Sequence, residues 1–158
     1  QAAVRELSRL LRHVLYDNQQ DYVTIDKEID FIRNYIELMR IRLAANVKVE
    51  TEININPNSR TEIAPLVFIS LIENAFKHGI SPTKPSFIHI SIREEADSIC
   101  CDIINSYHPK NEDDKSGSGI GLEQVQKRLD LLYPGKYEWQ KGVQKERAEY
   151  ESKLTIHV

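Results

Sequence analysis

The chain has 158 residues, a formal charge of −3 at neutral pH, 41% hydrophobic residues and 28% charged residues. These values describe one globular domain with a full core and room for an additional helical segment. The acidic balance and the lack of a basic block argue against direct nucleic-acid binding, and no apolar run approaches the roughly 18 residues that a membrane span needs.

Two helices are predicted at the beginning of the chain. The first has apolar residues at Leu7, Leu11 and Val14, and the second carries a similar stripe from Ile25 to Leu43. Stripes with this spacing are typical of helices that pack on other helices. Two core helices of one chain fit the pattern, and so does a dimer bundle. We assign residues 1–44 to a helical segment.

An α+β sandwich is predicted for residues 45–158. Helices are expected from Ala64-Pro65 to His78-Gly79, with proline at an early helical position, and from Gly119 to Tyr133. The polar residues 106–118 show no period. Alternating apolar residues predict the strands, at residues 47–55, 88–92, 99–103, 137–141 and 149–158.

The two cysteines are adjacent, at Cys100 and Cys101 in a predicted strand. Neighbouring strand residues point to opposite faces, so this pair is badly placed to form a disulfide. Free thiols are typical of a reducing cytoplasm.

The first of the two predicted helices in residues 45–158 carries a narrow polar stripe on an apolar body. Ser70, Glu73, Asn74 and Lys77 have offsets of 0, 3, 4 and 7 and therefore share one face. An amphipathic helix with its polar side in water explains this stripe. A metal–phosphate site explains it too, because amide and carboxylate oxygens suit Mg²⁺, while Lys77 and His78 would meet phosphate oxygens or the nucleoside.

Alternate glycines precede the second of these helices, in the run Gly117-Ser118-Gly119-Ile120-Gly121-Leu122. Glycines let a backbone approach a ligand closely, and a helix N-terminus offers free N–H groups to an anion. A flexible loop before a glycine-rich helix start is the plainer interpretation. The spacing matches neither the dinucleotide fingerprint nor the P-loop.

Asn105 ends a predicted strand, on the same face as Ile99, Cys101 and Ile103. A side-chain amide at the edge of an apolar face needs a hydrogen-bond partner. The edge of an adenine ring would supply that partner, and so would a capped turn.

The order of these segments resembles the ATPase domain of the GHKL superfamily, whose fold is known as the Bergerat fold. Residues 73–79, Glu-Asn-Ala-Phe-Lys-His-Gly, are similar to the N box of LytS-type sensor histidine kinases. The helix from Gly119 through Tyr133 is similar to that family's second glycine box. Leu7–Arg12 and Tyr35–Arg42 match its helical region, so the resemblance covers nearly the whole chain.

The resemblance implies ATP and Mg²⁺ as cofactors and gives each candidate residue a role. Asn74 would hold Mg²⁺ against the triphosphate, Lys77 and His78 would contact phosphates and nucleoside, and Glu73 would orient or activate the acceptor imidazole. The backbone of residues 117–122 would lie near the phosphates, at the end of a lid. Asn105 stands where the superfamily usually has an aspartate, and an amide oxygen accepts the adenine hydrogen bond about half as strongly. We therefore expect weak ATP binding.

The resemblance further implies the catalytic region of a two-component histidine kinase, which transfers the γ-phosphoryl group to a histidine. None of the five histidines has the family's Pro-His-Phe context, and the chain opens on Gln1 in mid-helix. We therefore expect a fragment whose acceptor histidine lies upstream. A response regulator, expected to be a transcription factor, would be its partner, and the N-terminal helices would form a homodimer. The fragment would be the cytoplasmic domain of a protein anchored upstream in the inner or plasma membrane.

Two other functions remain open at this stage. One is a degenerate GHKL nucleotide-binding module that serves as a regulatory or dimerisation scaffold without kinase activity. The other is a GHKL ATPase or an anti-sigma-type serine kinase, which would need a base four residues before Asn74. Ser70 stands at that position, and this last function leaves the N-terminal helices without a purpose.

Overall fold

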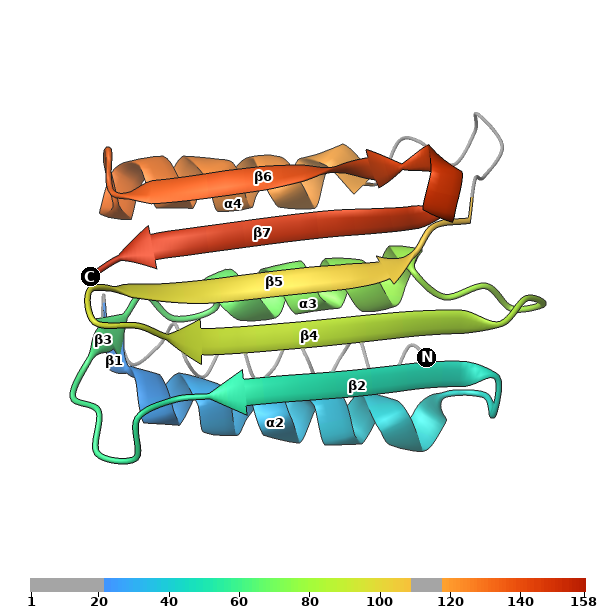
Figure 1. Ribbon diagram of the computed structural model, residues 1–158, viewed down its shortest axis with the longest axis horizontal. Helices are drawn as coiled ribbons and strands as arrows, with labels where there is room; N and C mark the ends of the chain where they lie inside the picture. The colour runs from blue at the N-terminus through green and yellow to red at the C-terminus, as the bar shows by residue number, and fades with distance from the viewer. Residues whose placement is uncertain (1–21, 109–117) are drawn as a thin grey trace. The chain divides into compact units, whose positions relative to one another are not determined.

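The computed structural model describes residues 22–108 and 118–158 (Figure 1). Its chain divides into two compact units. The first, which we call the helical unit, comprises residues 1–43 and 57–66. The second, the sheet unit, comprises residues 44–56 and 67–158. Each unit is described by itself.

The described part of the helical unit consists of one long helix and a short two-stranded sheet. Helix α2 (Ile25–Arg42) confirms the helix expected from Ile25 onward. Strands β1 (Val23–Thr24) and β3 (Glu62–Ile63) pair antiparallel. A backbone hydrogen bond links the start of α2 to the residue before β3: the Ile25 N–H donates to the Thr61 carbonyl at 2.8 Å. The predicted helix through Leu7 and Val14 lies outside the described residues.

The sheet unit contains a five-stranded sheet with the order β2-β4-β5-β7-β6. Strands β2 and β4 run parallel, and every other neighbouring pair is antiparallel. The sheet is therefore mixed, and all five strands expected from the alternating pattern are present. Their bounds are β2 Val47–Asn54, β4 Ser86–Glu94, β5 Ser98–Ser106, β6 Tyr137–Gln144 and β7 Glu149–His157.

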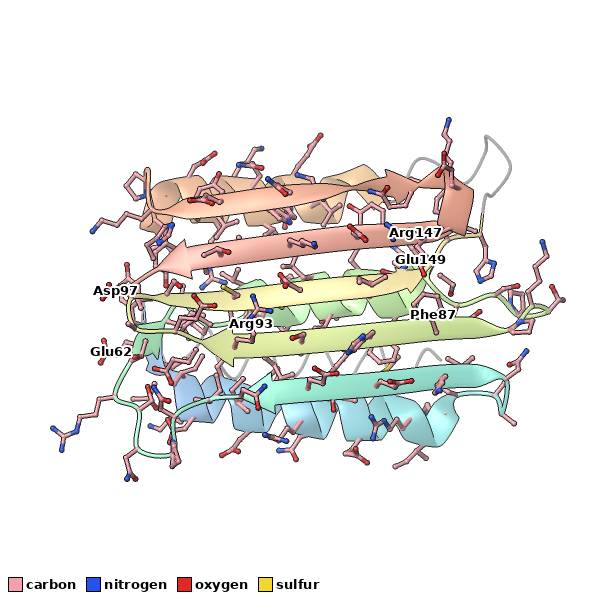
Figure 2. All side chains as sticks on the ribbon, in the orientation of Figure 1. Glu62, Phe87, Arg93, Asp97, Arg147 and Glu149 are labelled. Carbon is pink, nitrogen blue, oxygen red and sulfur yellow. The ribbon has the colours of Figure 1, made fainter. Side chains whose placement is uncertain are left out.

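Two helices of the sheet unit, α3 (Val67–His78) and α4 (Ser118–Leu132), lie side by side on one face of this sheet (Figure 1). Burial of apolar side chains from both layers is the main force that holds the sandwich together. The opposite sheet face carries paired charges, such as Arg93 and Asp102 at 3.0 Å (Figure 2). The core side chains are Ile88, Ile90, Ile92, Ile99, Cys101, Ile103, Leu154 and Ile156 from the sheet and Phe68, Ile72, Ala75, Val125 and Leu129 from the helices.

Helix α3 begins two residues later than the proline rule predicts. Instead of starting at Pro65, the chain passes through Leu66, whose φ of 71° lies in the left-handed region. The Leu66 N–H donates to the carboxyl group of Glu28, with N–O distances of 3.2 and 3.4 Å. Leu66 is thus held by a residue 38 positions away in the sequence, a contact that a local rule cannot foresee.

Both cysteines are free and buried, as expected. Cys101 faces the helix layer and pairs with Leu154 of β7. The Cys100 thiol lies 3.5 Å from the Thr155 hydroxyl. Burial raises the pKa of the Cys101 thiol. None of the helices within the described ranges is long and apolar enough to cross a membrane.

Replacing Leu66 tests the left-handed turn. Leu66→Ala and Leu66→Gly both lose a buried side chain, which costs about 2–5 kcal/mol. Glycine adopts a positive φ without the penalty of about 1–2 kcal/mol that other residues carry. We therefore expect Leu66→Gly to be about 1 kcal/mol more stable than Leu66→Ala in urea denaturation. An alanine variant as stable as the glycine variant would contradict the turn.

Candidate functional site

Three segments that lie far apart in the sequence meet at one end of the sheet unit. Helix α3 ends, strand β5 ends and helix α4 begins at this end (Figure 1). Helix α3 packs against both α4 and β5. The last turn of α3, Asn105 and the start of the glycine-rich helix therefore lie at the same end of the unit, although no local sequence pattern connects them.

The polar stripe of α3 lies where a ligand can reach it. Glu73, Asn74 and His78 are half-buried, and Lys77 is exposed at the last turn. Glu73 and His78 already interact with other groups of the protein. The apolar side of the same helix, which includes Phe68 and Ile72, is fully buried. Packing of that side therefore directs the polar stripe outward.

Asn105 packs directly on the end of α3. It is 3% exposed, and its Nδ2 donates to the Ser106 carbonyl at 2.9 Å. Gly79, the residue after α3, approaches so closely that an added Cβ would lie 2.8 Å from Asn105 Nδ2 and 2.7 Å from the Ala75 carbonyl. Only glycine fits this contact, which sets the distance between the end of α3 and the end of β5.

The hydroxyl group of Ser106 also holds the end of α3 against the sheet. It donates to the Gly79 carbonyl at 2.5 Å and accepts from the Phe87 N–H at 3.1 Å. Phe87 lies near the start of β4, at the end of the sheet where β7 begins with Glu149 (Figure 2). One buried hydroxyl thus joins α3, β4 and β5.

The residues after β5 are held by two further contacts. The Tyr107 N–H donates to the Ala148 carbonyl at 2.8 Å, in the turn before β7. His108 Nε2 lies 3.0 Å from the Ser86 hydroxyl, which also accepts from the Ser81 N–H at 3.0 Å. Burial lowers the pKa of His108, and the positive charge of Lys84 lowers it further. The imidazole is therefore neutral at physiological pH.

Helix α4 begins at Ser118, close to the predicted start at Gly119. Gly117 lies outside the described residues, and only the backbone is described for Ser118, Gly119 and Ile120. Gly121 is exposed, no described atom lies within 4 Å of the position that a Cβ would take, and Leu122 is half-buried. Among the described residues, none covers α4 at Gly121.

A tyrosine on β6 holds the other half of α4. The Tyr137 hydroxyl donates to Asp130 Oδ1 at 2.5 Å and accepts from the Gln126 amide. The hydrogen bond to Asp130, together with burial, raises the pKa of Tyr137 to about 12. This contact fixes α4 along the edge strand and so determines where its glycine-rich end points.

Gly79 and Ser106 are positioning residues that were not predicted from the sequence. A glycine directly after a predicted helix was a usable signal, because glycine is favoured at that position. Nothing local marked Ser106, whose role depends on partners 19 and 27 positions away. In the described parts of the chain, no group of three or more histidine, cysteine, aspartate or glutamate residues could hold a metal ion.

Substitution of Gly79 tests the contact with Asn105. Gly79→Ala forces a methyl group against a carbonyl and an amide, which we expect to cost about 1–3 kcal/mol. Gly142→Ala on β6 is the matched control, since nothing lies within 4 Å of its added Cβ. Thermal and urea unfolding measure both variants. Equal stability of the two would contradict the close approach.

The amino-acid sequence of the chain is similar to those of known histidine kinases. A family model described as "Histidine kinase" matches residues 1–47. Sensor histidine kinase YesM of Bacillus subtilis is 27% identical over 138 residues, which cover 85% of the chain and 24% of YesM. Sensor histidine kinase/phosphatase LytS of Staphylococcus aureus is 26% identical over 142 residues, covering 81% of the chain and 24% of LytS. The chain thus spans about a quarter of the length of these relatives.

Solved structures show the same fold at lower identity. The catalytic domain of histidine kinase ThkA matches 87% of the chain and 98% of its own length, with a TM-score of 0.63 and 16% identity. Histidine kinase AdeS of Acinetobacter baumannii matches 98% of the chain and 79% of its own, with a TM-score of 0.55 and 18% identity. The predicted α+β fold and the resemblance are therefore confirmed: this chain is similar in sequence to the sensor histidine kinases YesM and LytS over most of its length and has the fold of a histidine kinase catalytic domain.

Proposed function

We propose that the sheet unit is the ATP-binding catalytic region of a sensor histidine kinase, which transfers the ATP γ-phosphoryl group to a histidine upstream of this chain. The observation that carries the proposal is the meeting of the α3 stripe, Asn105 and the start of α4 at one end of the unit. The similarity to YesM and LytS, which are sensor histidine kinases, supports the same activity.

Asn74 supplies the metal ligand in this proposal. Mg²⁺ prefers oxygen donors and takes one or two protein groups together with phosphates and waters. One amide oxygen on a half-buried helix face therefore fits Mg²⁺ only when a nucleotide completes the coordination. Lys77, one turn further on and exposed, would neutralise phosphate charge, and His78 would contact phosphates or nucleoside.

Asn105 would read the adenine ring. Its Nδ2 is engaged by the Ser106 carbonyl, so its oxygen is the atom assigned to accept a hydrogen bond from the adenine amino group. A neutral acceptor makes a weaker bond than the carboxylate usual at this position. We therefore expect adenine to be bound with modest affinity, consistent with the weak ATP binding expected from the sequence.

The start of α4 would receive the phosphates. Backbone N–H groups at a helix N-terminus bind anions, and the helix dipole adds to the attraction. This assigns the backbone of residues 117–122 to the phosphates, and no described atom fills the position of a Cβ at Gly121. Phosphoryl transfer then depends on positioning and charge neutralisation, while Glu73 would orient or activate the acceptor imidazole.

The second candidate is a degenerate nucleotide-binding scaffold without kinase activity. The neutral Asn105 favours it, because the charge-assisted adenine contact is missing. The accessible Asn74 and the open helix start favour the kinase. ThkA has been solved in complex with response regulator protein TrrA, so we assign a response regulator, in its usual role as a transcription factor, as partner. A homodimer through the N-terminal helices and a membrane anchor upstream complete the proposal.

Thermal shift with a Mg²⁺–ATP analogue tests the metal assignment. A ligand at 100 times its Kd should stabilise the native chain by about 2.7 kcal/mol. We expect Asn74→Ala to lose the Mg²⁺-dependent part of the shift, because it removes the amide oxygen. Asn54→Ala, at the exposed end of β2, is the control and should keep the native shift.

Two results would count against these assignments. An Asn74→Ala shift that still depends on Mg²⁺ would remove Asn74 from the metal site. A native chain that shows no shift at millimolar nucleotide would favour the scaffold over the kinase.

Gly121→Ala separates folding from phosphate binding. The added methyl group meets no described atom within 4 Å, so the free protein should be as stable as the native chain or more stable by about 0.5–1 kcal/mol. Nucleotide binding should weaken about tenfold, equal to about 1.4 kcal/mol, because the methyl group occupies the space left for phosphates. Calorimetry measures both effects with Gly142→Ala as control. Unchanged nucleotide affinity would contradict the phosphate assignment.

A further inference from the structure

The sheet face turned away from α3 and α4, which we call the outer face, departs from its polar pattern at two positions. Along β4, the outer positions His89, Ser91 and Arg93 are polar, as expected for a strand with one buried side. Phe87 on β4 and Ile104 on β5 lie on the same face and are half-buried. Single apolar residues on a surface are ordinary, whereas adjacent ones often mark a binding surface.

These two apolar side chains are neighbours. Ile104 pairs with His89 in the β4–β5 register, and Phe87 lies two positions before His89, a diagonal spacing that large side chains bridge. Both line a hollow of about 360 Å³, near the lower end of the range of about 300–1,000 Å³ for ligand sites. All residues that line it belong to the sheet unit. A volume of this size suits an apolar side chain better than a large ligand.

The charges around the hollow do not balance. On the β2 side, Lys48 pairs with Glu50 at 3.0 Å and lowers the pKa of that carboxyl group, so these two charges cancel. On the β7 side, one guanidinium group, that of Arg147, pairs with both Glu149 and Glu151, at 3.6 and 3.2 Å. Figure 2 shows Arg147 and Glu149 at the end of the sheet where Phe87 lies. One negative charge is therefore in excess on the β7 side.

This excess charge is partly shielded from water. The side chains of Glu149 and Glu151 are 23% and 20% exposed, and partly buried charges are screened less than fully exposed ones. Lys153, the next residue on the outer face of β7, lies opposite Asp102, one row further from the hollow. The hollow thus combines an apolar surface with a negative charge on one side.

We propose that this hollow is a docking site for a partner protein, and that it binds a segment with one branched apolar side chain next to a lysine or arginine. The apolar side chain would cover Phe87 and Ile104, and the apolar surface removed from water would supply the affinity. The neighbouring cation would meet the excess negative charge, which orients the segment and disfavours acidic ones. This role goes beyond the proposed kinase activity, whose residues belong to the helix layer and the inner sheet face.

The experiment follows the NMR signals of Phe87 and Ile104 while the whole chain is titrated with three acetylated tripeptide amides. The first peptide has leucine between two arginines, the second alanine between two arginines, and the third leucine between two glutamates. The chain is also diluted without peptide. Shifts of the same two residues that depend on protein concentration would assign the hollow to a second copy of the chain and overturn the proposal.

We expect the leucine–arginine peptide to bind with a Kd of about 1 mM. The alanine peptide should bind about fivefold more weakly, because it covers less apolar surface. The glutamate peptide should also bind about fivefold more weakly at low salt, and this difference should shrink at high salt, where charges are screened.

Two substitutions assign these preferences to residues. Ile104→Ser should remove the preference for leucine over alanine, and Glu149→Gln should reduce the preference for arginine over glutamate while the preference for leucine remains. Glu138→Gln is the matched control, because Glu138 is exposed, lies on the outer face of β6 and pairs at the surface with His157 at 3.2 Å. It should leave both preferences unchanged, and dispersed NMR spectra verify that each variant is folded.

Three further results would overturn the docking site. These are equal binding of the leucine and alanine peptides, equal binding of the arginine and glutamate peptides at low salt, and no shift of Phe87 and Ile104 at about 10 mM peptide, ten times the expected Kd. None of them bears on the proposed kinase function, which the nucleotide measurements test separately.

Discussion

The contact between Gly79 and Asn105 is the constraint on which the candidate site depends. A Cβ at residue 79 would lie 2.8 Å from Asn105 Nδ2, so the end of α3 reaches the end of β5 only because glycine has no side chain. The Ser106 hydroxyl then fastens the approach by bonding the Gly79 carbonyl and the Phe87 N–H. The last turn of α3, with Lys77 and His78, is thereby held beside the amide of Asn105.

The sandwich around this corner explains why its polar groups remain accessible. The apolar side of α3 is buried on the inner sheet face, where Ile88, Ile90 and Ile103 are almost fully buried. A helix with one buried side must turn its other side outward, and that side holds Glu73 and Asn74. Hydrophobic packing thus orients the polar stripe, and no polar contact is needed to hold it out.

The sequence was a sufficient guide for elements with a strong period and a poor one for elements held by distant contacts. Isoleucines alternate along β4, and the expected strand is present, because a half-buried strand repeats every two residues. Strands β1 and β3 have two residues each and are too short to show any period. The predicted start of α3 was wrong by two residues, because the chain makes a left-handed turn at Leu66 before the helix begins.

By itself the sequence determined which residues carry the candidate chemistry, since the offsets of Glu73, Asn74 and Lys77 on one helix follow from helical geometry alone. It also indicated the family, because the order of the motifs is a property of the chain. Only the tertiary structure decided that Asn105 abuts Gly79, that Ser106 joins three elements and that Glu28 holds Leu66. The physical reason is that periodicity is local, whereas each of these contacts joins residues 19 to 38 positions apart.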